Sequence, residues 1–530
     1  MNRGANARTV AVSRKAFSAN EGCVIDGAVF DNGGMVVHSL VDQAAAAAPD
    51  ARAVRDSRGG WNYRELVRLS HGFAAWLAER GVRARDRVLV QLPNAKELVG
   101  VVYGASRAGA SLVPLNPGMK EFHLSSVLAD SEPSLVIVAD AAAPAMRELT
   151  AVPVHGITEV WHEVEALAAS GRQATTAGPA AHEAALLIYT SGSTAAPKGV
   201  VCPHRQVTFS ASAINAVLRY HPGDVVFTRL PLSFDYGLYQ IFLAALGHAE
   251  LVLAGDAPDT ALLSQLRACG ATIVPVVPSL GAMLATLGRR EPGSAPTVRM
   301  FTNTGAALPA STIEGLRETF PGARVVRMYG ITECKRVTIM PPEQDRDRPD
   351  AVGLPLPGTE VLILDGDGQP VPTGQVGEIV VVGPNVMAGY WRAPELTART
   401  YRPSAETGEI RMHTGDYGLL DEDGYLYFEG RRDDMFKRKG HRMSTVEIEA
   451  AAMDVPGVRA AAVLPPTDRH DLTLFVESEL APQAVLRELA KRLEPQKVPA
   501  SCHVLERFPL TLNGKNERKQ LTALLEGSTA

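Results

Sequence analysis

Small hydroxylated residues gather in one short stretch of the chain, between two apolar runs. Residues 189–200 read Tyr-Thr-Ser-Gly-Ser-Thr-Ala-Ala-Pro-Lys-Gly-Val and follow the apolar run 184–188. This pattern predicts a strand, a polar loop and a second strand. Hydroxyl and backbone N–H groups of such a loop can turn toward phosphate oxygens, and Lys198 can supply a cation. The candidate phosphate-binding residues are Thr190, Ser191, Gly192, Ser193, Thr194 and Lys198.

The loop by itself does not decide between phosphate binding and an ordinary surface turn. It is not a Walker A loop, because Lys198 follows a proline and no helix opens on a Gly-Lys-Ser/Thr sequence. Loops rich in serine, threonine and glycine are commonly solvent-exposed turns. The choice therefore depends on the rest of the chain.

Short apolar runs alternate with longer segments of helical spacing. The runs 88–90, 135–138 and 251–253 are bounded by polar residues or glycine, and segments 63–80 and 97–108 have the spacing of amphipathic helices. Buried strands that alternate with helices indicate an α/β architecture with largely parallel sheets.

The texture changes toward the C-terminus. From about residue 353 to 389, frequent turn residues separate β-branched runs such as 378–382, which predicts a small β-rich subdomain. The charged stretch 431–434 is a candidate hinge. The last hundred residues then predict a compact α/β piece with helices near 444–453 and 482–493.

Length and composition limit the possible classes of protein. A chain of 530 residues is too long for one hydrophobic core, so several domains are expected. We expect a flexible tail over 1–35, a large domain over 36–433 and a small domain over 434–530. The net charge of −5 argues against a nucleic-acid partner, and no apolar run approaches the roughly 18 residues of a membrane helix.

Cysteine usage and the N-terminus indicate a cytoplasmic protein. The 5 cysteines show no CxxC spacing, which fits a reducing compartment and neither a disulfide framework nor a zinc site. The first 20 residues are basic but have no long apolar core, so they are no secretory signal. A disordered tail is the expectation there, and a transit peptide is the alternative. A monomer or a homodimer is expected.

Several further motifs follow the polar loop in a fixed order. They are Asn303-Thr304-Gly305-Ala306-Ala307, Met328-Tyr329-Gly330-Ile331-Thr332-Glu333, His413-Thr414-Gly415-Asp416, Gly430-Arg431-Arg432-Asp433 and Leu512-Asn513-Gly514-Lys515. With these motifs the chain resembles, from about residue 36 to 522, the adenylate-forming superfamily of acyl-CoA synthetases, peptide-synthetase adenylation domains and luciferases. The resemblance implies a large N-terminal domain of two α/β sheet subdomains plus a small β-rich subdomain. A small mobile α/β domain would follow it.

The resemblance also implies roles on the nucleotide side. Adenylation joins a carboxylate to the α-phosphate of ATP and expels pyrophosphate, so two anions must be neutralised and aligned. By resemblance, Tyr329 lies near adenine, Thr332 touches phosphate and Glu333 helps to hold Mg²⁺. Asp416 resembles the aspartate that accepts both ribose hydroxyls, and Arg431 resembles a further ribose contact. The remaining ATP-binding positions are Gly305, Ala306, Ala307 and Gly330.

Residues of the small domain are implied to act after a domain movement. In the superfamily, the lysine that corresponds to Lys515 enters the active site and bridges the carboxylate and the α-phosphate. Asp433 occupies the hinge position. Lys437, Lys439 and Gly440 lie on the loop that would face the thioester-forming side.

The acid-binding pocket is less well specified. Asp235 stands where amino-acid-activating domains have aspartate and where many fatty and aryl CoA ligases have histidine, so it hints at a substrate ammonium group. The alternative is a helix N-cap. Lys335 and Arg336, near the mouth, either contact an anionic substrate group or form a surface salt bridge. The other expected lining residues are Phe234, Tyr239, Asn303, Thr304, Gly305 and Gly330.

Two positions depart from the superfamily pattern. Ala195 replaces a usual glycine of the phosphate loop, which would strain the loop if it needs a positive φ there. Thr445-Val446 stand where a glycine often precedes the Glu-Ile-Glu run. The second departure bears on the acceptor side and the first on ATP binding.

The leading hypothesis is an ATP- and Mg²⁺-dependent ligase for a carboxylic acid, amino-bearing or aryl. It would form an acyl-adenylate and pass the acyl group to CoA or to the phosphopantetheine of a separate acyl or peptidyl carrier protein. One alternative is an adenylating enzyme of secondary metabolism with a non-thiol acceptor, by amine transfer or nitrogen activation. Another is a non-catalytic sensor, against which Lys198, Glu333, Asp416 and Lys515 all count.

Overall fold

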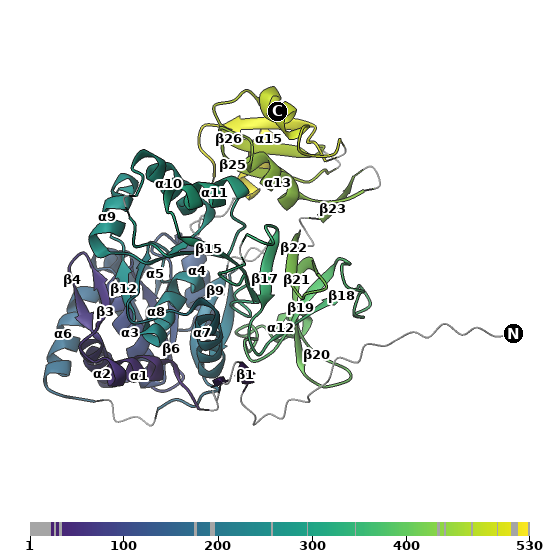
Figure 1. Cartoon of the computed structure of the whole chain (residues 1–530). Coiled ribbons are helices and arrows are strands. Elements are labelled where there is room, and N and C mark those ends of the chain that lie inside the picture. Colours follow the sequence, from purple (N-terminus) through teal and green to yellow (C-terminus); the bar gives the residue numbers. More distant parts are fainter. Residues whose placement is uncertain are drawn as a thin grey trace.

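The structure is a computed structural model (Figure 1). It describes residues 23–25, 28–30, 34–173, 178–190, 197–255, 258–293, 295–344, 346–431, 435–438, 441–467, 470–495, 497–509 and 518–527. Most of the expected tail, the candidate hinge residue Asp433 and Lys515 lie outside these residues. A short antiparallel pair, β1 Cys23–Ile25 and β2 Ala28–Phe30, falls within the expected tail.

The first sheet of the large part ends with the two strands that flank the polar loop in the sequence. Its six strands have the order β10-β9-β6-β5-β7-β8. They are β5 Arg87–Gln91, β6 Ser111–Leu115, β7 Leu135–Val138, β8 Val154–Gly156, β9 Ala184–Thr190 and β10 Lys198–Pro203. All neighbours are parallel except β9 and β10, which form a hairpin with Lys198 opposite Thr190. The two predicted strands are thus confirmed, and residues 191–196 between them lie outside the described residues.

The second sheet is larger and changes from parallel to antiparallel pairing. Its parallel part has the order β15-β14-β13-β11-β12-β3, with β4 antiparallel at the edge. These strands are β3 Arg52–Asp56, β4 Gly59–Asn62, β11 Val225–Thr228, β12 Glu250–Leu253, β13 Ile273–Val276, β14 Met300–Asn303 and β15 Arg324–Tyr329.

The predicted β-rich subdomain extends the second sheet instead of forming a sheet of its own. Its strands are β16 Thr338–Ile339, β17 Ala351–Pro355, β18 Glu360–Leu364, β19 Gly377–Val382, β20 Tyr401–Pro403, β21 Ile410–Leu420 and β22 Leu426–Arg431. They are joined to β15 through β16 and β17, all by antiparallel pairs. The subdomain therefore continues beyond residue 389 to β22.

Helices pack on both sheets of the large part (Figure 1). They are α1 Val37–Ala47, α2 Tyr63–Glu79, α3 Lys96–Ala108, α4 Glu121–Ser131, α5 Ala143–Leu149, α6 Ile157–Ala169, α7 His204–Leu218, α8 Asp235–Gly247, α9 Leu262–Cys269, α10 Pro278–Arg290, α11 Ala310–Thr319 and α12 Pro394–Thr400, with the 3₁₀ turns η1 Asp140–Ala142 and η2 Asp259–Ala261. The predicted helices 63–80 and 97–108 correspond to α2 and α3. Helix α2 begins at a capping box, in which Asn62 accepts from the Glu65 N–H and the Glu65 carboxylate accepts from the Asn62 N–H.

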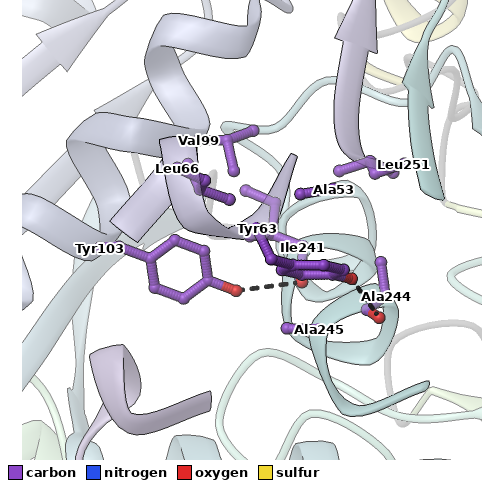
Figure 2. Close-up of a pocket in the computed structure, with 9 residues that line it drawn as sticks. All are labelled: Ala53, Tyr63, Leu66, Val99, Tyr103, Ile241, Ala244, Ala245 and Leu251. Carbon is purple, nitrogen blue, oxygen red and sulfur yellow. Dashed lines mark hydrogen bonds between the residues drawn. The ribbon is translucent and has the colours of Figure 1, made fainter. Parts of the chain in front are cut away.

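Helix α8 lies in the main core and is held from behind by two tyrosines. Almost every residue of α8 is buried, as expected for a helix that is apolar on all sides. The Tyr63 hydroxyl donates to the Ala244 carbonyl at 2.9 Å, and the Tyr103 hydroxyl donates to the Ile241 carbonyl at 3.2 Å (Figure 2). These two bonds fix the middle and the C-terminal end of α8 against α2 and α3, from which the tyrosines come.

The C-terminal residues form a separate small lobe with its own core (Figure 1). It contains the hairpin β23 Met435–Arg438 and β24 His441–Ser444, the sheet β25 Val458–Leu464, β26 Thr473–Ser478 and β27 Ser501–Leu505, and helices α13 Thr445–Met453, α14 Pro482–Leu489 and α15 Arg518–Gly527. The predicted helix 482–493 is shorter in the structure, because residues 490–493 leave α14 in a tight turn ahead of Pro495. No helix in the described part of the chain is long and apolar enough to cross a membrane.

Candidate active site

The candidate residues meet at the carboxyl ends of adjacent strands of the second sheet. β14 ends at Asn303 and β15 ends at Tyr329, and the two strands are parallel neighbours. The loops that follow them therefore leave the sheet side by side, where ligands commonly bind in α/β proteins. Helix α8 reaches the same place, since the Tyr236 and Thr302 hydroxyls lie 2.7 Å apart.

Three predicted nucleotide residues come together on the antiparallel side. The Tyr329 hydroxyl donates to Asp416 at 2.6 Å, and Arg431, opposite Asp416 on β22, places its Nε 3.3 Å from the same carboxylate. Burial and the adjacent Asp416 raise the pKa of Tyr329 well above its usual range, so the hydroxyl remains a donor. Arg431 is 62% exposed whereas Asp416 is buried, so solvent reaches the Arg431 side of this ion pair.

A second carboxylate, which sequence reasoning missed, supports the irregular part of β21 just before Asp416. Glu378 on β19 lies 2.9 Å from His413 Nδ1 and accepts from the Gly415 N–H at 3.2 Å. Burial alone would raise the pKa of Glu378, but His413 and the Gly415 N–H hold it below its usual value. The bonds hold residues 413–415 against β19. Glu378 shows no distinguishing sequence signal, because its run reads only as a strand.

Glu333 is half-buried and is also held by a tyrosine. The Tyr390 hydroxyl donates to Glu333 Oε1 at 2.7 Å. Burial and the neighbouring Glu333 raise the pKa of Tyr390, which keeps the hydroxyl protonated. Tyr390 lies 57 positions from Glu333 along the chain, and it was not predicted from the sequence.

The residues present fit a magnesium ion that is held mainly by phosphate. Within the described ranges, no three His, Cys, Asp or Glu side chains cluster as a metal cage would require. Magnesium is usually bound through one or two carboxylates, with water and substrate phosphates as the other ligands. The oriented carboxylate of Glu333 suits this arrangement, because a carboxylate bonded at one oxygen still offers lone pairs.

The acid side of the site contains buried charges. Lys335 is 0% exposed, Arg336 4% and Asp235 5%. The surface salt-bridge interpretation of Lys335 and Arg336 is therefore wrong, since both side chains are buried. Lys335 Nζ lies 5.9 Å from the centre of the Tyr239 ring, and the Arg336 guanidinium lies 4.9 Å from that of Tyr236.

These contacts place both cations against the first two turns of α8, whose first residue is Asp235. The helix N-cap is Phe234, and no side chain makes a cap hydrogen bond, so the N-cap interpretation of Asp235 is also wrong. Asp235 in the first turn is favoured by the helix dipole. In the described part of the chain, Lys335 Nζ has no hydrogen-bonding oxygen. Burial raises the pKa of the adjacent Cys202 thiol, which therefore adds no negative charge.

The loop between Tyr329 and Arg336 is folded tightly. Lys335 has a φ of 64°, in the left-handed region that few non-glycine residues adopt. A Cβ at Gly330 would lie 2.0 Å from the Lys335 carbonyl oxygen, so only glycine fits there. The loop is thus bent back on itself, which brings Lys335 and Arg336 under α8.

The other predicted residues are placed as follows. Asn303 and Thr304 are buried, and Asn303 donates to the Val276 carbonyl at 3.2 Å. Gly305, Ala306 and Ala307 are exposed, Thr332 is half-buried, and Thr190 and Lys198 flank the polar loop. Residues predicted in the loop and small lobe that lie outside the described ones are Ser191, Gly192, Ser193, Thr194, Ala195, Asp433, Lys439, Gly440 and Lys515; Lys437 is described only as part of β23.

Comparison with protein families identifies the chain. Residues 41–391 match the AMP-binding enzyme family. The chain belongs to this family. Its predicted membership of the adenylate-forming superfamily is thereby confirmed, together with the α/β fold of a large domain and a small C-terminal domain. Enzymes of this kind activate acids or amino acids with ATP.

The curated relatives of this AMP-binding enzyme include peptide synthetases. It is 32% identical over 497 residues to the probable non-canonical nonribosomal peptide synthetase CymA of Salinispora arenicola, a match that covers 91% of this chain and 6% of CymA. It is 31% identical over 502 residues to one of the plipastatin synthase proteins of Bacillus subtilis, a match that covers 92% of this chain and 19% of that protein. The chain therefore spans a small part of the length of these relatives.

The matches with solved structures of similar proteins extend over almost the whole length of those proteins. The structure of VinN in complex with L-aspartate is 54% identical, with a TM-score of 0.71, over 75% of this chain and 99% of that one. ATP-bound MatB from Rhodopseudomonas palustris is 26% identical, with a TM-score of 0.82, over 92% and 99%. This AMP-binding enzyme is thus similar to one protein whose structure contains an amino acid and to another whose structure contains ATP.

Proposed function

We propose that this enzyme activates an amino dicarboxylic acid of the aspartate class as its acyl-adenylate, with ATP and Mg²⁺. The observation that carries this proposal is the burial of Lys335 and Arg336 against the helix that begins with Asp235. Arg336 Nη1 donates to the Lys335 carbonyl at 3.0 Å, but Lys335 Nζ and Arg336 Nε have no hydrogen-bond partner among the described residues. Burying a charge that lacks a partner costs free energy, which a bound anion would offset. A ligand with a carboxylate for the two cations and an ammonium for Asp235 supplies those partners.

The chemistry of the three side chains specifies the ligand further. A guanidinium and an ammonium together offer several charge-assisted hydrogen bonds to one carboxylate. Asp235, as an acceptor, suits an ammonium group. The second carboxyl group of the substrate remains for activation, near Thr332 and Glu333 at the end of β15. Two complexes of VinN, with L-aspartate and with 3-methylaspartate, support this substrate class.

We propose that the nucleotide occupies the opposite side of the site. Asp416 and Arg431 would hold the ribose, Tyr329 would lie by the adenine, and Thr332 would contact phosphate. Bound Mg²⁺ on Glu333 would neutralise phosphate charge as pyrophosphate leaves. The arrangement of Tyr329, Asp416 and Arg431 supports this assignment.

The small C-terminal domain is assigned to the transfer of the activated acyl group. The small domain, 434–530, would turn about Asp433 and bring Lys515 into the site, with the large domain at 36–433. The activated acyl group would then pass to the thiol of CoA or of a separate carrier protein, and the peptide synthetases among the relatives favour the carrier protein. An amine acceptor is the alternative.

Pyrophosphate release with a panel of acids tests the substrate class. We expect the highest kcat/KM with L-aspartate or 3-methylaspartate, and lower values with succinate, β-alanine and L-alanine, each of which lacks one charged group. Equal or better activity with an acid that has one carboxylate and no amine would overturn the proposal. Adding CoA or a pantetheine-loaded carrier protein after adenylation then distinguishes the acceptors.

The variant Asp235→Ala tests the ammonium contact. We expect it to reduce kcat/KM for L-aspartate about 100-fold, because a buried charge partner typically contributes about 3 kcal/mol. The loss with succinate, the deamino analogue, should be much smaller. Equal losses with both acids would show that Asp235 acts on structure and not on the ammonium.

A further inference from the structure

One segment outside all the predicted motifs touches several parts of the site. Residues 385–391, here called the brace, connect the end of β19 to α12. Asn385 within it is 0% exposed, and its side-chain amide donates to the Cys334 carbonyl at 3.2 Å and to the Arg336 carbonyl at 3.0 Å. One amide group therefore binds the backbone on both sides of Lys335.

We propose that Asn385 is a positioning residue that sets the enzyme's preference for a dicarboxylate. It does so by holding Lys335 and Arg336 where they meet the second carboxylate. This inference rests on the proposed function, because it assigns to Asn385 the placement of the two cations. Asn385 itself touches backbone, so it would act through Lys335 and Arg336.

The conformation of Lys335 explains why such a clamp is needed. Its φ of 64° lies in a region that disfavours residues with a Cβ, and only the surrounding structure can maintain it. The two carbonyls that Asn385 binds belong to the residues directly before and after Lys335. Without those two hydrogen bonds, the backbone can relax to a negative φ and redirect the Lys335 side chain away from α8.

The rest of the brace anchors Asn385 to the nucleotide side. The Met387 N–H donates to the Glu333 carbonyl at 2.9 Å, and the Tyr390 hydroxyl holds the Glu333 carboxylate. The Val201 N–H donates to the Gly389 carbonyl at 2.9 Å. The brace therefore links β10, which begins at Lys198, to the loop that carries Glu333 and Lys335. A rigid anchor of this kind allows one side chain to impose a fixed position on the cations.

Removing the Asn385 amide would have a different effect if its role were only structural. It would lower stability and reduce turnover of every acid alike. A positioning role predicts a selective effect instead: loss of the second-carboxylate contact, with ATP binding preserved. The preference ratio, kcat/KM for L-aspartate divided by kcat/KM for β-alanine or L-alanine, separates the two cases.

The test is Asn385→Ala, measured by pyrophosphate release with L-aspartate, β-alanine and L-alanine. We expect KM for L-aspartate to rise about tenfold, as is typical when an outer-shell partner of a binding group is removed. The KM for ATP should stay close to the wild-type value, because the Asn385 side chain binds only the Cys334 and Arg336 carbonyls and no residue assigned to the nucleotide. Equal proportional losses with all three acids, or an unchanged preference ratio, would overturn the inference.

A double-variant cycle shows whether Asn385 acts through Lys335. In the Lys335→Met background, Asn385→Ala should lower the preference ratio much less than it does in the wild-type background, because only Arg336 remains of the two side chains that Asn385 positions. A full additional loss would overturn the inference. The control is Asn62→Ala, which removes an asparagine from the α2 capping box, far along the chain from the brace. It should leave the ratio unchanged.

The variant Asn385→Leu repeats the measurement with the side-chain volume kept, in case the alanine variant does not fold. Failure of both to fold would make Asn385 a folding residue and overturn the inference. If wild-type enzyme shows no preference for dicarboxylates, the proposed function itself fails. A wild-type preference that Asn385→Ala and Asn385→Leu both retain contradicts only the role of Asn385.

Discussion

The two sides of the site handle charge in opposite ways. On the nucleotide side, Asp416 and Glu333 each accept a hydrogen bond from a tyrosine hydroxyl. On the acid side, Lys335 and Arg336 are buried beside aromatic rings, and no carboxylate of the described residues pairs with either. The two carboxylates of the nucleotide side thus have hydrogen-bond donors within the described part of the chain, whereas Lys335 Nζ on the acid side has no hydrogen-bond partner there.

This difference separates the general part of the enzyme from the specific part. Buried polar groups in proteins are almost always satisfied, and the exceptions concentrate at functional sites. Under the proposed function, the substrate supplies the partner that the described residues do not. The unpaired cations of the acid side therefore point to an anionic group on the proposed substrate. Four experiments test or refine this comparison of the two sides.

The largest effect is expected for Lys515→Ala, which should be equal for all acids. By resemblance, Lys515 neutralises charge that develops in the transition state, and loss of such a group costs about 1,000-fold in kcat. Pyrophosphate exchange measures the loss, and ATP binding should remain. Lys491→Ala is the control, since Lys491 is an exposed lysine of the same lobe that pairs with Glu488. Wild-type exchange rates in Lys515→Ala would contradict the assigned role.

Lys335→Met should harm dicarboxylates alone and should not weaken the fold. We expect kcat/KM for L-aspartate to fall about 100-fold, which corresponds to about 3 kcal/mol for a buried charge contact. Burying an unpaired cation costs free energy, so an apolar side chain of similar size should leave the stability of the ligand-free enzyme equal or higher. Thermal unfolding of the ligand-free enzyme checks this second result. A lower Tm together with equal losses for all acids would show that Lys335 is structural.

Tyr390→Phe should weaken Mg²⁺ use by about tenfold, because outer-shell partners of a metal ligand typically contribute that much. The Mg²⁺ concentration for half-maximal pyrophosphate release measures it at saturating ATP. Tyr401→Phe is the matched control: its ring lies 5.8 Å from that of Tyr390, but its hydroxyl has no partner among the described residues. If the two variants behave alike, Tyr390 does not position Glu333.

The smallest expected effect concerns pH and lies outside both sides of the site. Burial lowers the pKa of His204 to about 4, and its Nδ1 accepts from the Val37 N–H at 3.1 Å, which requires the neutral ring. The ordinary pKa is 6.5. Between pH 6.5 and about 4, His204 binds a proton in the unfolded chain but not in the folded chain. The contribution of this histidine to the free energy of unfolding is therefore fully present above pH 6.5 and decreases as the pH falls toward 4.

Denaturant unfolding at several pH values measures this loss. One such histidine contributes a slope of about 1.4 kcal/mol per pH unit within that window. His204→Gln should reduce the slope, while His38, whose pKa burial also lowers to about 4, retains its share. An unchanged slope would contradict the assignment. This experiment separates acid inactivation by unfolding from titration within the site.

Sequence motifs supplied more candidate residues for the nucleotide side than for the acid side. Tyr329, Asp416 and Arg431 belong to motifs of fixed order, and the structure brings them together. Tyr390 and Glu378 were missed because they act from distant strands and segments, and no local pattern marks them. Asn385 was missed for a further reason: it binds carbonyl groups, which every residue possesses.

The fold shows a similar limit. Alternating apolar runs and helical spacing predicted β5, β7, β12, α2 and α3. They did not predict that the β-rich segment joins the second sheet, because strand partners depend on contacts between distant residues. The burial of Lys335 and Arg336 was unpredictable for the same reason, since charged residues in a loop are ordinarily solvated.

The tyrosine anchors behind α8 have a consequence for how this enzyme can be altered. Tyr63 and Tyr103 bind the C-terminal part and the middle of the helix whose first residue is Asp235. A substitution that shifts either tyrosine contact would tilt or translate α8 and so move Asp235. Laboratory evolution toward a longer or shorter acid therefore has a route through positions buried in the N-terminal half, none of which ever meets the molecule being selected.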